Sequence, residues 1–365
     1  MKVAVLIDTW FPHIGGGQIN SLEISKKLAL NGIHVEIITR DNGKDNLKLS
    51  NNIKVIKLGS YKKPHDQISQ IIFCIKAFFY VFKKEYSLVH AHAFWPGLTA
   101  RLLMVTKGIP AVFTVHGTSI NTSLLNPLAR RVEKFILNEI LYTVQTTVSR
   151  DFLKIKNINK KIVYIPNGIN IQEFETPQRS DSNAKTLIFV GRLHPQKNLI
   201  NLIKAIKIVI GQNTTNLVIV GNGPQRKDLE KIIRLESLTK NVKLLGEIPQ
   251  RNLKQYYSRS HLFILPSLYE GFPLTLLEAW ASKLPVITSM TGESQFLVKN
   301  GQNGYLINDA YSPQEIAKTI NKALENRNLA KLGLAGYNLV KSQYTWDKAA
   351  QETLKVYENV LKSQN

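Results

Sequence analysis

Two glutamates separated by seven residues mark the segment between Pro266 and Trp280. Glu270 follows an apolar run, 262–265, and lies in a loop rich in Gly and Pro, whereas Glu278 lies about one turn into the apolar helix that comes next. α/β proteins use a strand, a loop and a helix in this order to present backbone N–H groups to an anionic ligand. A loop carboxylate and a helix carboxylate face different parts of such a ligand. The spacing therefore indicates a ligand site in which the two glutamates have separate tasks.

A second segment of the same kind carries two cations. The apolar run 187–190 leads into Gly191 and Arg192, and Lys197 stands just before the next predicted helix. A guanidinium can bond two phosphate oxygens at once, whereas an ammonium is a compact point charge. Two fixed cations would stabilise the negative charge that grows on a phosphate leaving group as its bond to the rest of a substrate breaks. The alternative is an exposed basic loop.

The first half of the chain has two weaker signals. The apolar run 3–7 leads through Gly15 and Gly16 into a helix, and glycines let the backbone approach a phosphate closely. Without further support this stretch is also typical of a connecting turn. His116 ends the run 111–115, where an imidazole could orient a hydroxyl group of a ligand or help polarise a leaving group, the alternative being a structural role.

No metal site and no disulfide is predicted. His90 and His92 alternate on one strand face, but no third ligand has suitable spacing, so we interpret both as structural. Cys74 is the only cysteine, which excludes an internal disulfide and fits a reducing, cytoplasmic setting. No stretch approaches the roughly 18 uninterrupted apolar residues of a membrane span.

Apolar runs alternate with helical patterns along the chain, which is typical of parallel sheets covered by helices. The predicted strands are 3–7, 35–39, 55–58, 88–91, 111–115, 144–148, 163–165, 187–190, 217–220, 242–245, 262–265 and 286–288. The predicted helices are 18–31, 68–84, 95–106, 127–142, those that begin at Asn198 and at Pro224, the one that carries Glu278, and 346–362.

The length of 365 residues suits two domains. The fold class is therefore α/β, with two Rossmann-like doubly wound parallel-sheet domains and a deep cleft between them. Residues 171–185 are polar and turn-rich, so they are predicted to link the domains 1–170 and 186–345. Ligands of such sheets collect at the carboxyl ends of the strands.

The chain is strongly basic, with a formal net charge of +22. The first 170 residues hold 23 Lys and Arg against 10 Asp and Glu, so the excess is larger in the shorter half. A bias of this kind favours an anionic membrane face, a phosphate-rich acceptor or nucleic acid as the partner. The alternative is a lysine-rich but merely solvated surface.

The predicted helix 68–84 bears on the membrane hypothesis. Its apolar stripe is wider than a half-buried helix needs, and two groups of basic residues accompany it. The stripe is Ile68, Ile71, Ile72, Ile75, Phe79 and Phe82, and the basic groups are Lys76, Lys83 and Lys84, and Arg130, Arg131 and Lys134. Together they could place the first domain on an anionic bilayer, at the cytoplasmic face of the plasma membrane. The alternative is that this helix packs on the sheet.

The glutamate segment, read as PS-x-YEGFP-x-x-x-LEA, resembles the E-x7-E signature of retaining glycosyltransferases, most closely family 4 of the GT-B fold. Residues 191–198 are similar to that family's G-R-L-x-x-x-K-[GN] element, 163–170 to its V-x-I-P-N-G segment and 221–224 to its G-x-G-P turn. The chain departs from the family at Ile33, at Asn170 and beyond Val286. The likeness covers nearly the whole chain and is more specific in the second half.

The resemblance implies a retaining glycosyltransferase that moves a hexose from a nucleoside diphosphate sugar, UDP-linked before GDP-linked, to a glycan or lipid-linked acceptor. The first domain would then bind the acceptor and the second the donor, with 346–365 crossing back to the first. Glu278 would hold the ribose, Glu270 the donor sugar, and Arg192 and Lys197 the diphosphate, so that no metal or other cofactor is required. The catalytic residues implied are His116, Arg192, Lys197 and Glu270, and the donor-binding ones are Gly15, Gly16, Gly191, Arg192, Lys197, Glu270, Gly271, Phe272, Pro273, Leu274 and Glu278.

Two other functions remain as alternatives. A nucleotide-sugar 2-epimerase of the same fold would need acid/base carboxylates in the cleft, and the E-x7-E signature speaks against it. A nucleic-acid-binding or DNA-modifying protein would explain the charge, but the sequence has no recognisable reading helix and no basic strand rich in aromatic residues. We therefore expect no nucleic-acid partner.

Overall fold

The computed structural model describes residues 1–12, 15–43, 47–61, 66–92, 94–116, 144–154, 162–175 and 184–363. Its contacts divide the chain into two compact units. Unit 1 combines Met1–Asn167 with Trp346–Asn365, and unit 2 is Gly168–Thr345. The predicted helix 127–142, the basic group at Arg130 and most of the predicted linker lie outside the described residues.

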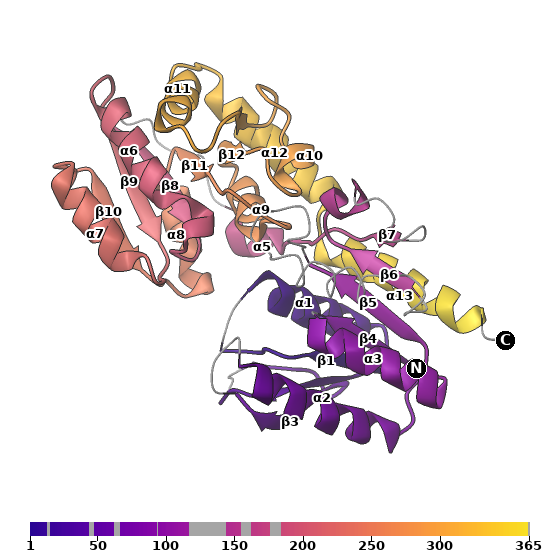
Figure 1. Cartoon of the computed structure of the whole chain (residues 1–365). Helices are drawn as coiled ribbons and strands as arrows, with labels where there is room; N and C mark the ends of the chain where they lie inside the picture. Colours follow the sequence, from indigo (N-terminus) through magenta and orange to yellow (C-terminus); the bar gives the residue numbers. More distant parts are fainter. Residues whose placement is uncertain are drawn as a thin grey trace. The chain divides into compact units, whose positions relative to one another are not determined.

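Unit 1 is built on a seven-stranded parallel sheet with the order β3-β2-β1-β4-β5-β6-β7 (Figure 1). Its central strands are buried along almost their whole length, as expected for a parallel sheet covered on both faces. The strands are β1 Lys2–Ile7, β2 His34–Asp41, β3 Ile53–Ser60, β4 Leu88–His92, β5 Ala111–Val115, β6 Val144–Thr147 and β7 Ile162–Tyr164. The described helices are α1 Gly16–Leu30, α2 Gln67–Phe82, α3 Phe94–Lys107 and α13 Trp346–Lys362, with a 3-10 turn at Arg150–Lys154.

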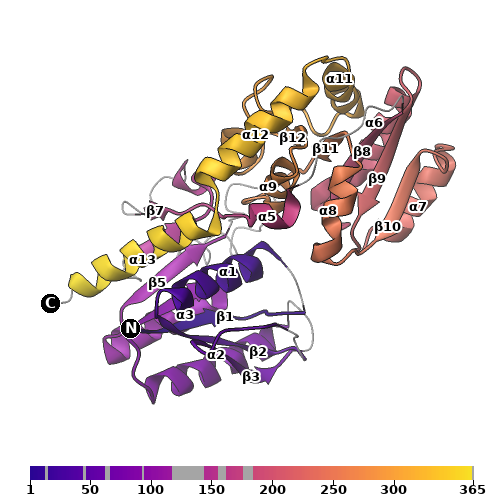
Figure 2. The same ribbon diagram turned by 180° about the vertical axis from the view of Figure 1, so that it is seen from behind.

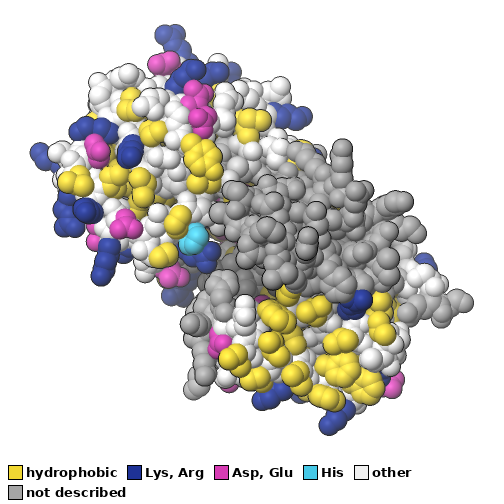
Figure 3. All heavy atoms as spheres, viewed as in Figure 1, with side chains coloured by type: hydrophobic (Ala, Val, Ile, Leu, Met, Phe, Trp, Pro, Cys, Tyr) yellow, Lys and Arg dark blue, Asp and Glu magenta, His cyan; other side chains and the backbone are white. Residues whose placement is uncertain are grey.

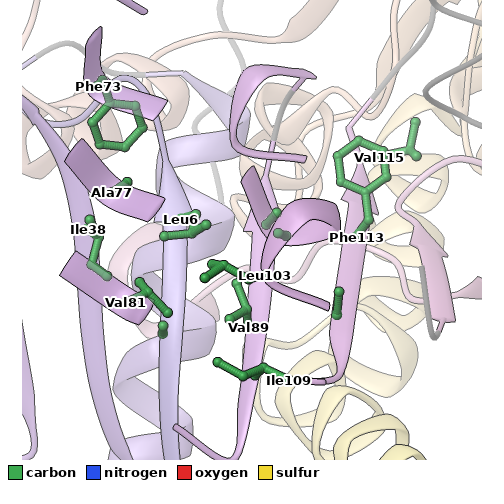
Figure 4. Packing of buried hydrophobic residues seen from close by; sticks show 14 of the residues in the cluster. Leu6, Ile38, Phe73, Ala77, Val81, Val89, Leu103, Ile109, Phe113 and Val115 are labelled. Carbon is green, nitrogen blue, oxygen red and sulfur yellow. The ribbon is translucent and has the colours of Figure 1, made fainter. Parts of the chain in front are cut away.

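Helices α2 and α3 cover one face of this sheet. Phe73, Ala77 and Val81 of α2 are fully buried and pack on strand residues such as Leu6 and Val89 (Figure 4). The other side of α2 is exposed. The alternatives stated for this helix are therefore not exclusive, because one face packs on the sheet and leaves the other free.

Helices α1 and α13 lie side by side over the opposite face of the sheet (Figures 1 and 2). An ion pair of 2.7 Å between Lys27 Nζ and Asp347 Oδ1 joins them. Helix α13 also buries Tyr357 completely. The last helix of the chain thus completes unit 1, although it follows unit 2 in sequence.

Unit 2 contains a six-stranded parallel sheet with the order β10-β9-β8-β11-β12-β13. The strands are β8 Lys185–Val190, β9 Thr215–Val220, β10 Val242–Gly246, β11 Leu262–Leu265, β12 Val286–Ser289 and β13 Tyr305–Ile307. The helices are α5 Ile171–Phe174, α6 Leu199–Ile210, α7 Arg226–Leu235, α8 Gln250–Ser258, α9 Leu274–Ala281, α10 Ser294–Leu297, α11 Pro313–Leu324 and α12 Leu329–Gln343, with a 3-10 turn at Pro195–Lys197.

The two parallel-sheet α/β units confirm the predicted fold class. The first four residues of the predicted linker instead form α5, where Phe174 is buried and its carbonyl accepts a hydrogen bond from Ser282 Oγ at 3.0 Å. These residues belong to unit 2. Within the described ranges, no helix is long and apolar enough to cross a membrane.

Candidate active site

The two motif loops of unit 2 meet at the carboxyl edge of its sheet. Strands β8 and β11 are adjacent, so the loops that follow them emerge side by side. Lys197 Nζ lies 2.5 Å from Glu270 Oε1, and both side chains are largely shielded from solvent. Arg192, five residues earlier in the first loop, is exposed. The structure therefore joins two predicted site residues directly and leaves the guanidinium accessible.

Hydrogen bonds between the loops hold this ion pair in place. Gln196 Nε2 donates to the Tyr269 carbonyl at 2.6 Å, and the Leu268 N–H donates to the Gln196 carbonyl at 2.8 Å. Asn198 adopts a left-handed conformation with φ of 59° and donates through Nδ2 to the Pro266 carbonyl at 3.2 Å. Because each bond crosses from one loop to the other, the Lys197 and Glu270 backbones are fixed relative to each other.

Glu278 lies deeper, on α9, where only 5% of its surface is exposed. Tyr257 on α8 donates a hydrogen bond of 2.7 Å to Glu278 Oε2. Burial raises the pKa of Glu278 to about 7, the bond from Tyr257 acts in the opposite direction, and the charge of Glu173 raises it further. The sequence offered no signal for Tyr257, since α8 was not predicted.

The first turn of α9 has no side-chain cap. Its N-cap residue, Pro273, provides no side-chain bond to the N–H groups that follow. Phe272 and Leu274, the apolar members of the predicted site, are buried. Gly271 accepts a hydrogen bond of 2.8 Å at its carbonyl from the Glu293 N–H. The predicted residues 271–274 thus form a supported loop that leads into a helix N-terminus, the geometry that suits a phosphate or sugar oxygen.

Glycines elsewhere at this edge are required by packing. A Cβ on Gly221 would stand 1.9 Å from the Gly191 carbonyl oxygen, and one on Gly292 would stand 2.0 Å from the Glu270 carbonyl oxygen. The turn at 221–224 therefore supports the Arg192 loop from behind. Residues 291–296, from which the sequence suggested no site, support the glutamate loop in the same way.

In unit 1, the glycine-rich segment forms the start of α1. Gly15 is its N-cap and supplies no side-chain bond, and in the described part of the chain nothing lies within 4 Å of the point where a Cβ on Gly16 would stand. A Cβ on Gly17 would lie 3.4 Å from Cδ2 of His116. The predicted residues Gly15, Gly16 and His116 are thus close together, in a unit separate from the cation pair.

His116 is also beside a second histidine. His92 Nδ1 and His116 Nε2 lie 2.8 Å apart, and burial lowers the pKa of His116 to about 4. Burial likewise lowers the pKa of His92 and brings that of His90 to about 3. All three imidazoles are therefore neutral near pH 7. Among the described residues, no group of three His, Cys, Asp or Glu side chains is arranged to hold a metal ion.

A buried polar network connects α2 to the same edge of unit 1. Arg40 donates from Nε to the Asp8 carbonyl at 2.7 Å and from Nη1 to Ser69 Oγ at 2.8 Å. Gln70 Nε2 donates to Asp8 Oδ2 at 2.7 Å. Since Asp8 follows β1 directly and Ser69 and Gln70 belong to α2, the start of this helix is fixed to the strand end that leads into the glycine-rich segment.

Comparison with known proteins gives a family match for each of the two units. The family model described as glycosyl transferases group 1 matches residues 170–335, and the model described as glycosyltransferase family 4 matches residues 14–173. UDP-Gal:α-D-GlcNAc-diphosphoundecaprenol α-1,3-galactosyltransferase of Escherichia coli is 27% identical, over 93% of this chain and 94% of its own length.

Solved structures bear out the fold. Sucrose-phosphate synthase from Thermosynechococcus elongatus gives a TM-score of 0.86 at 23% identity, over 99% of each chain. The structure of Anabaena Alr3699/HepE in complex with UDP-glucose gives a TM-score of 0.82 at 20% identity. The match covers 98% of this chain and 100% of that chain. The predicted family resemblance is confirmed, because one model or the other matches the chain from residue 14 to residue 335. The protein belongs to family 4 of the GT-B glycosyltransferases.

Proposed function

We propose that the protein is a retaining glycosyltransferase that moves a hexose from UDP to a glycan or lipid-linked acceptor at an anionic membrane surface. The observation that carries the proposal is the Lys197–Glu270 pair of 2.5 Å beside the uncapped start of α9. A diphosphate needs the cation and the backbone donors, and a sugar hydroxyl can donate to the carboxylate. The UDP-glucose complex of Alr3699/HepE supports UDP as the nucleotide.

The two glutamates are poorly placed to act as the carboxylate pair of a glycosidase. Such a pair must flank the bond that breaks, with both carboxyl groups directed at it. Here Glu270 forms an ion pair with Lys197. Glu278 is buried and accepts a hydrogen bond from the Tyr257 hydroxyl. This arrangement favours separate tasks for the two glutamates, in which Glu270 binds the donor sugar and Glu278 binds the ribose. It also disfavours a 2-epimerase, whose chemistry needs carboxylates available for proton transfer.

The reaction that follows has no protein nucleophile. The bond between the sugar C1 and the diphosphate oxygen breaks, and the acceptor oxygen bonds to C1 on the same face. The acceptor proton passes to the departing phosphate oxygen. Arg192 and Lys197 stabilise the charge on that oxygen, and the first-unit residues Gly16 and His116 supply further donors to the substrate.

A donor screen tests this function. We expect slow hydrolysis of a UDP-hexose, weaker hydrolysis of GDP-hexose, and the same rates with EDTA present, because two side-chain cations take the place of a metal. Release of free sugar and UDP would be followed by chromatography. Activity that disappears in EDTA and returns with Mg²⁺ would contradict the metal-free proposal. A 2-epimerised sugar or glycal as the product would favour the epimerase.

The membrane part of the proposal rests on the outer face of α2. Its side chains form an apolar stripe that continues onto α3, with lysines around it (Figure 3). The exposed members are Ile68, Ile71, Ile72, Ile75, Phe79 and Phe82 of α2, and Leu102 and Val105 of α3. Aliphatic and aromatic groups rimmed by cations suit the boundary between headgroups and acyl chains, and each nearby lysine adds about 1 kcal/mol on an anionic surface.

Vesicle binding checks this surface. We expect the protein to sediment with vesicles that contain phosphatidylglycerol, and the triple variant Ile75→Ser, Phe79→Ser, Phe82→Ser to stay in solution. The variant Leu235→Ser is the control, because Leu235 is 73% exposed but belongs to unit 2. Equal sedimentation of the triple variant and the wild type, or no binding by the wild type, would exclude this role for α2.

A further inference from the structure

The sheet face beneath α1 and α13 carries a row of buried polar side chains. Strands β4 and β5 pair so that His92 stands beside Thr114, and His90 lies two residues before His92 on the same face. Both histidines are 2% exposed. Their ring centroids are 4.3 Å apart. Two polar rings buried in contact on a central strand are costly unless their nitrogens are bonded, so the partners of each nitrogen are informative.

His90 uses both ring nitrogens for structure. Its Nδ1 is 2.6 Å from the Tyr357 hydroxyl of α13, and its Nε2 is 2.6 Å from Thr114 Oγ1. Thr114 Oγ1 is in turn 2.6 Å from Thr146 Oγ1. These bonds fix the His90 ring between the last helix and the sheet. Because the His92 ring packs against it, His92 has little freedom to rotate.

His92 is directed instead at a predicted site residue. Its Nδ1 lies 2.8 Å from Nε2 of His116, and the two rings are nearly parallel, with an interplanar angle of 20°. The remaining His116 nitrogen, Nδ1, is buried and has no hydrogen-bond partner within the described residues. A Cβ added to Gly17, in the first turn of α1, would lie 3.4 Å from the same ring. Among the described residues, His116 therefore has one ring nitrogen in contact with His92 and one without a hydrogen-bond partner.

We propose that His92 is a positioning residue that donates its Nδ1–H to Nε2 of His116 and so keeps the His116 proton on Nδ1. A neutral imidazole has one donor and one acceptor nitrogen. Once Nε2 accepts from His92, the other nitrogen must carry the hydrogen. An oxygen attracted to the uncapped start of α1 then finds a fixed N–H donor beside it. The proposal depends on the proposed function only for the identity of this oxygen, a phosphate or sugar oxygen of the nucleotide sugar.

Two substitutions separate positioning from packing. His92→Leu keeps an apolar side chain in the buried space but removes the donor, whereas His92→Asn places an amide N–H where Nδ1 stands. Tyr357→Phe is the matched control, because it removes a buried hydrogen bond of 2.6 Å from His90 on the same face without altering the partner of His116. A purely structural role predicts similar effects of His92→Leu and Tyr357→Phe.

The direct readout is the position of the proton on His116. Nitrogen-15 spectra of histidine-labelled protein distinguish protonated from bare ring nitrogens, and the variant His116→Gln identifies the His116 signals among those of the eight histidines. We expect Nδ1–H in the wild type, in Tyr357→Phe and in His92→Asn, and a shift toward Nε2–H in His92→Leu. The spectra are taken without substrate, so they test the proposal even if the proposed transfer reaction is wrong.

Kinetics supply the second readout. We expect His92→Leu to lower kcat about tenfold, as the loss of one buried hydrogen bond would, with KM nearly unchanged and most of the rate restored in His92→Asn. Tyr357→Phe should lower the melting temperature more than kcat. The proposal is overturned if the wild-type proton sits on Nε2, or if His92→Leu leaves both the proton position and kcat unchanged.

Discussion

Arg192→Ala is expected to slow sugar transfer by a factor of about 10² to 10³, the usual loss when one fixed donor to a developing oxyanion is removed. Because the Arg192 side chain is exposed, the melting temperature should not change. Lys197→Ala should slow transfer to a similar degree, but it also leaves the buried Glu270 carboxylate without the ammonium 2.5 Å away. Lys197→Ala should therefore also lower stability.

Transfer rates and thermal melts, measured together, separate these effects. The double variant Lys197→Ala, Glu270→Gln removes the isolated charge, so it should recover stability without recovering transfer. Lys240→Ala, an exposed lysine of the same unit, is the control for a change of net charge. Near-normal transfer by Arg192→Ala and by the double variant would show that these cations do not carry the leaving-group charge.

Glu278→Gln is expected to weaken UDP binding by about 10- to 100-fold, because hydrogen bonds to a charged acceptor are the stronger ones. Ribose hydroxyls donate, so they favour the ionised carboxylate. With a pKa near 7, that form is depleted as the pH falls below neutrality. Wild-type affinity should therefore rise between pH 6 and pH 8, whereas the affinity of Glu278→Gln should not. Calorimetric titrations with UDP at several pH values give both results.

The substitution Glu278→Gln, which should weaken UDP binding, should raise the stability of the ligand-free protein. The folded-state pKa of Glu278 is raised from 4.5 to about 7, so its contribution to stability is complete below 4.5 and is lost as the pH rises through 7. Ligand-free Glu278→Gln should then be more stable than the wild type at pH 8. Glu325→Gln, at the end of α11, is the surface control. A variant that is less stable at pH 8 and binds UDP normally would contradict both roles of Glu278.

The central strands of unit 1 could be predicted well from the sequence because they are buried on both faces. Runs such as 3–7 and 111–115 are continuous and apolar, so they differ clearly from the helices between them. Strand β13 and helix α8 of unit 2 were missed because this signal is weak there. Strand β13 has three residues at the edge of the sheet, and α8 buries only Leu253 and Tyr257 among polar neighbours.

The candidate site was predictable only as separate motifs. The sequence placed Glu270 in a loop and Glu278 on a helix, but the contact of Glu270 with Lys197 spans 73 positions and follows from the order of β8 and β11 in the sheet. In the same way, the contact of His92 with His116 depends on the register of two strands. Local patterns carry no information on strand order or register, so these pairs could not be foreseen.

The return of α13 to unit 1 has a consequence for how the chain folds during synthesis. Residues 346–365 are synthesised after the whole of unit 2, yet they belong to unit 1, where the Tyr357 hydroxyl contacts Nδ1 of His90. Unit 1 must therefore wait, with one sheet face incompletely covered, until all of unit 2 has been made. A stop codon shortly before Trp346 would leave unit 2 whole and deprive the first-made unit of its final helix.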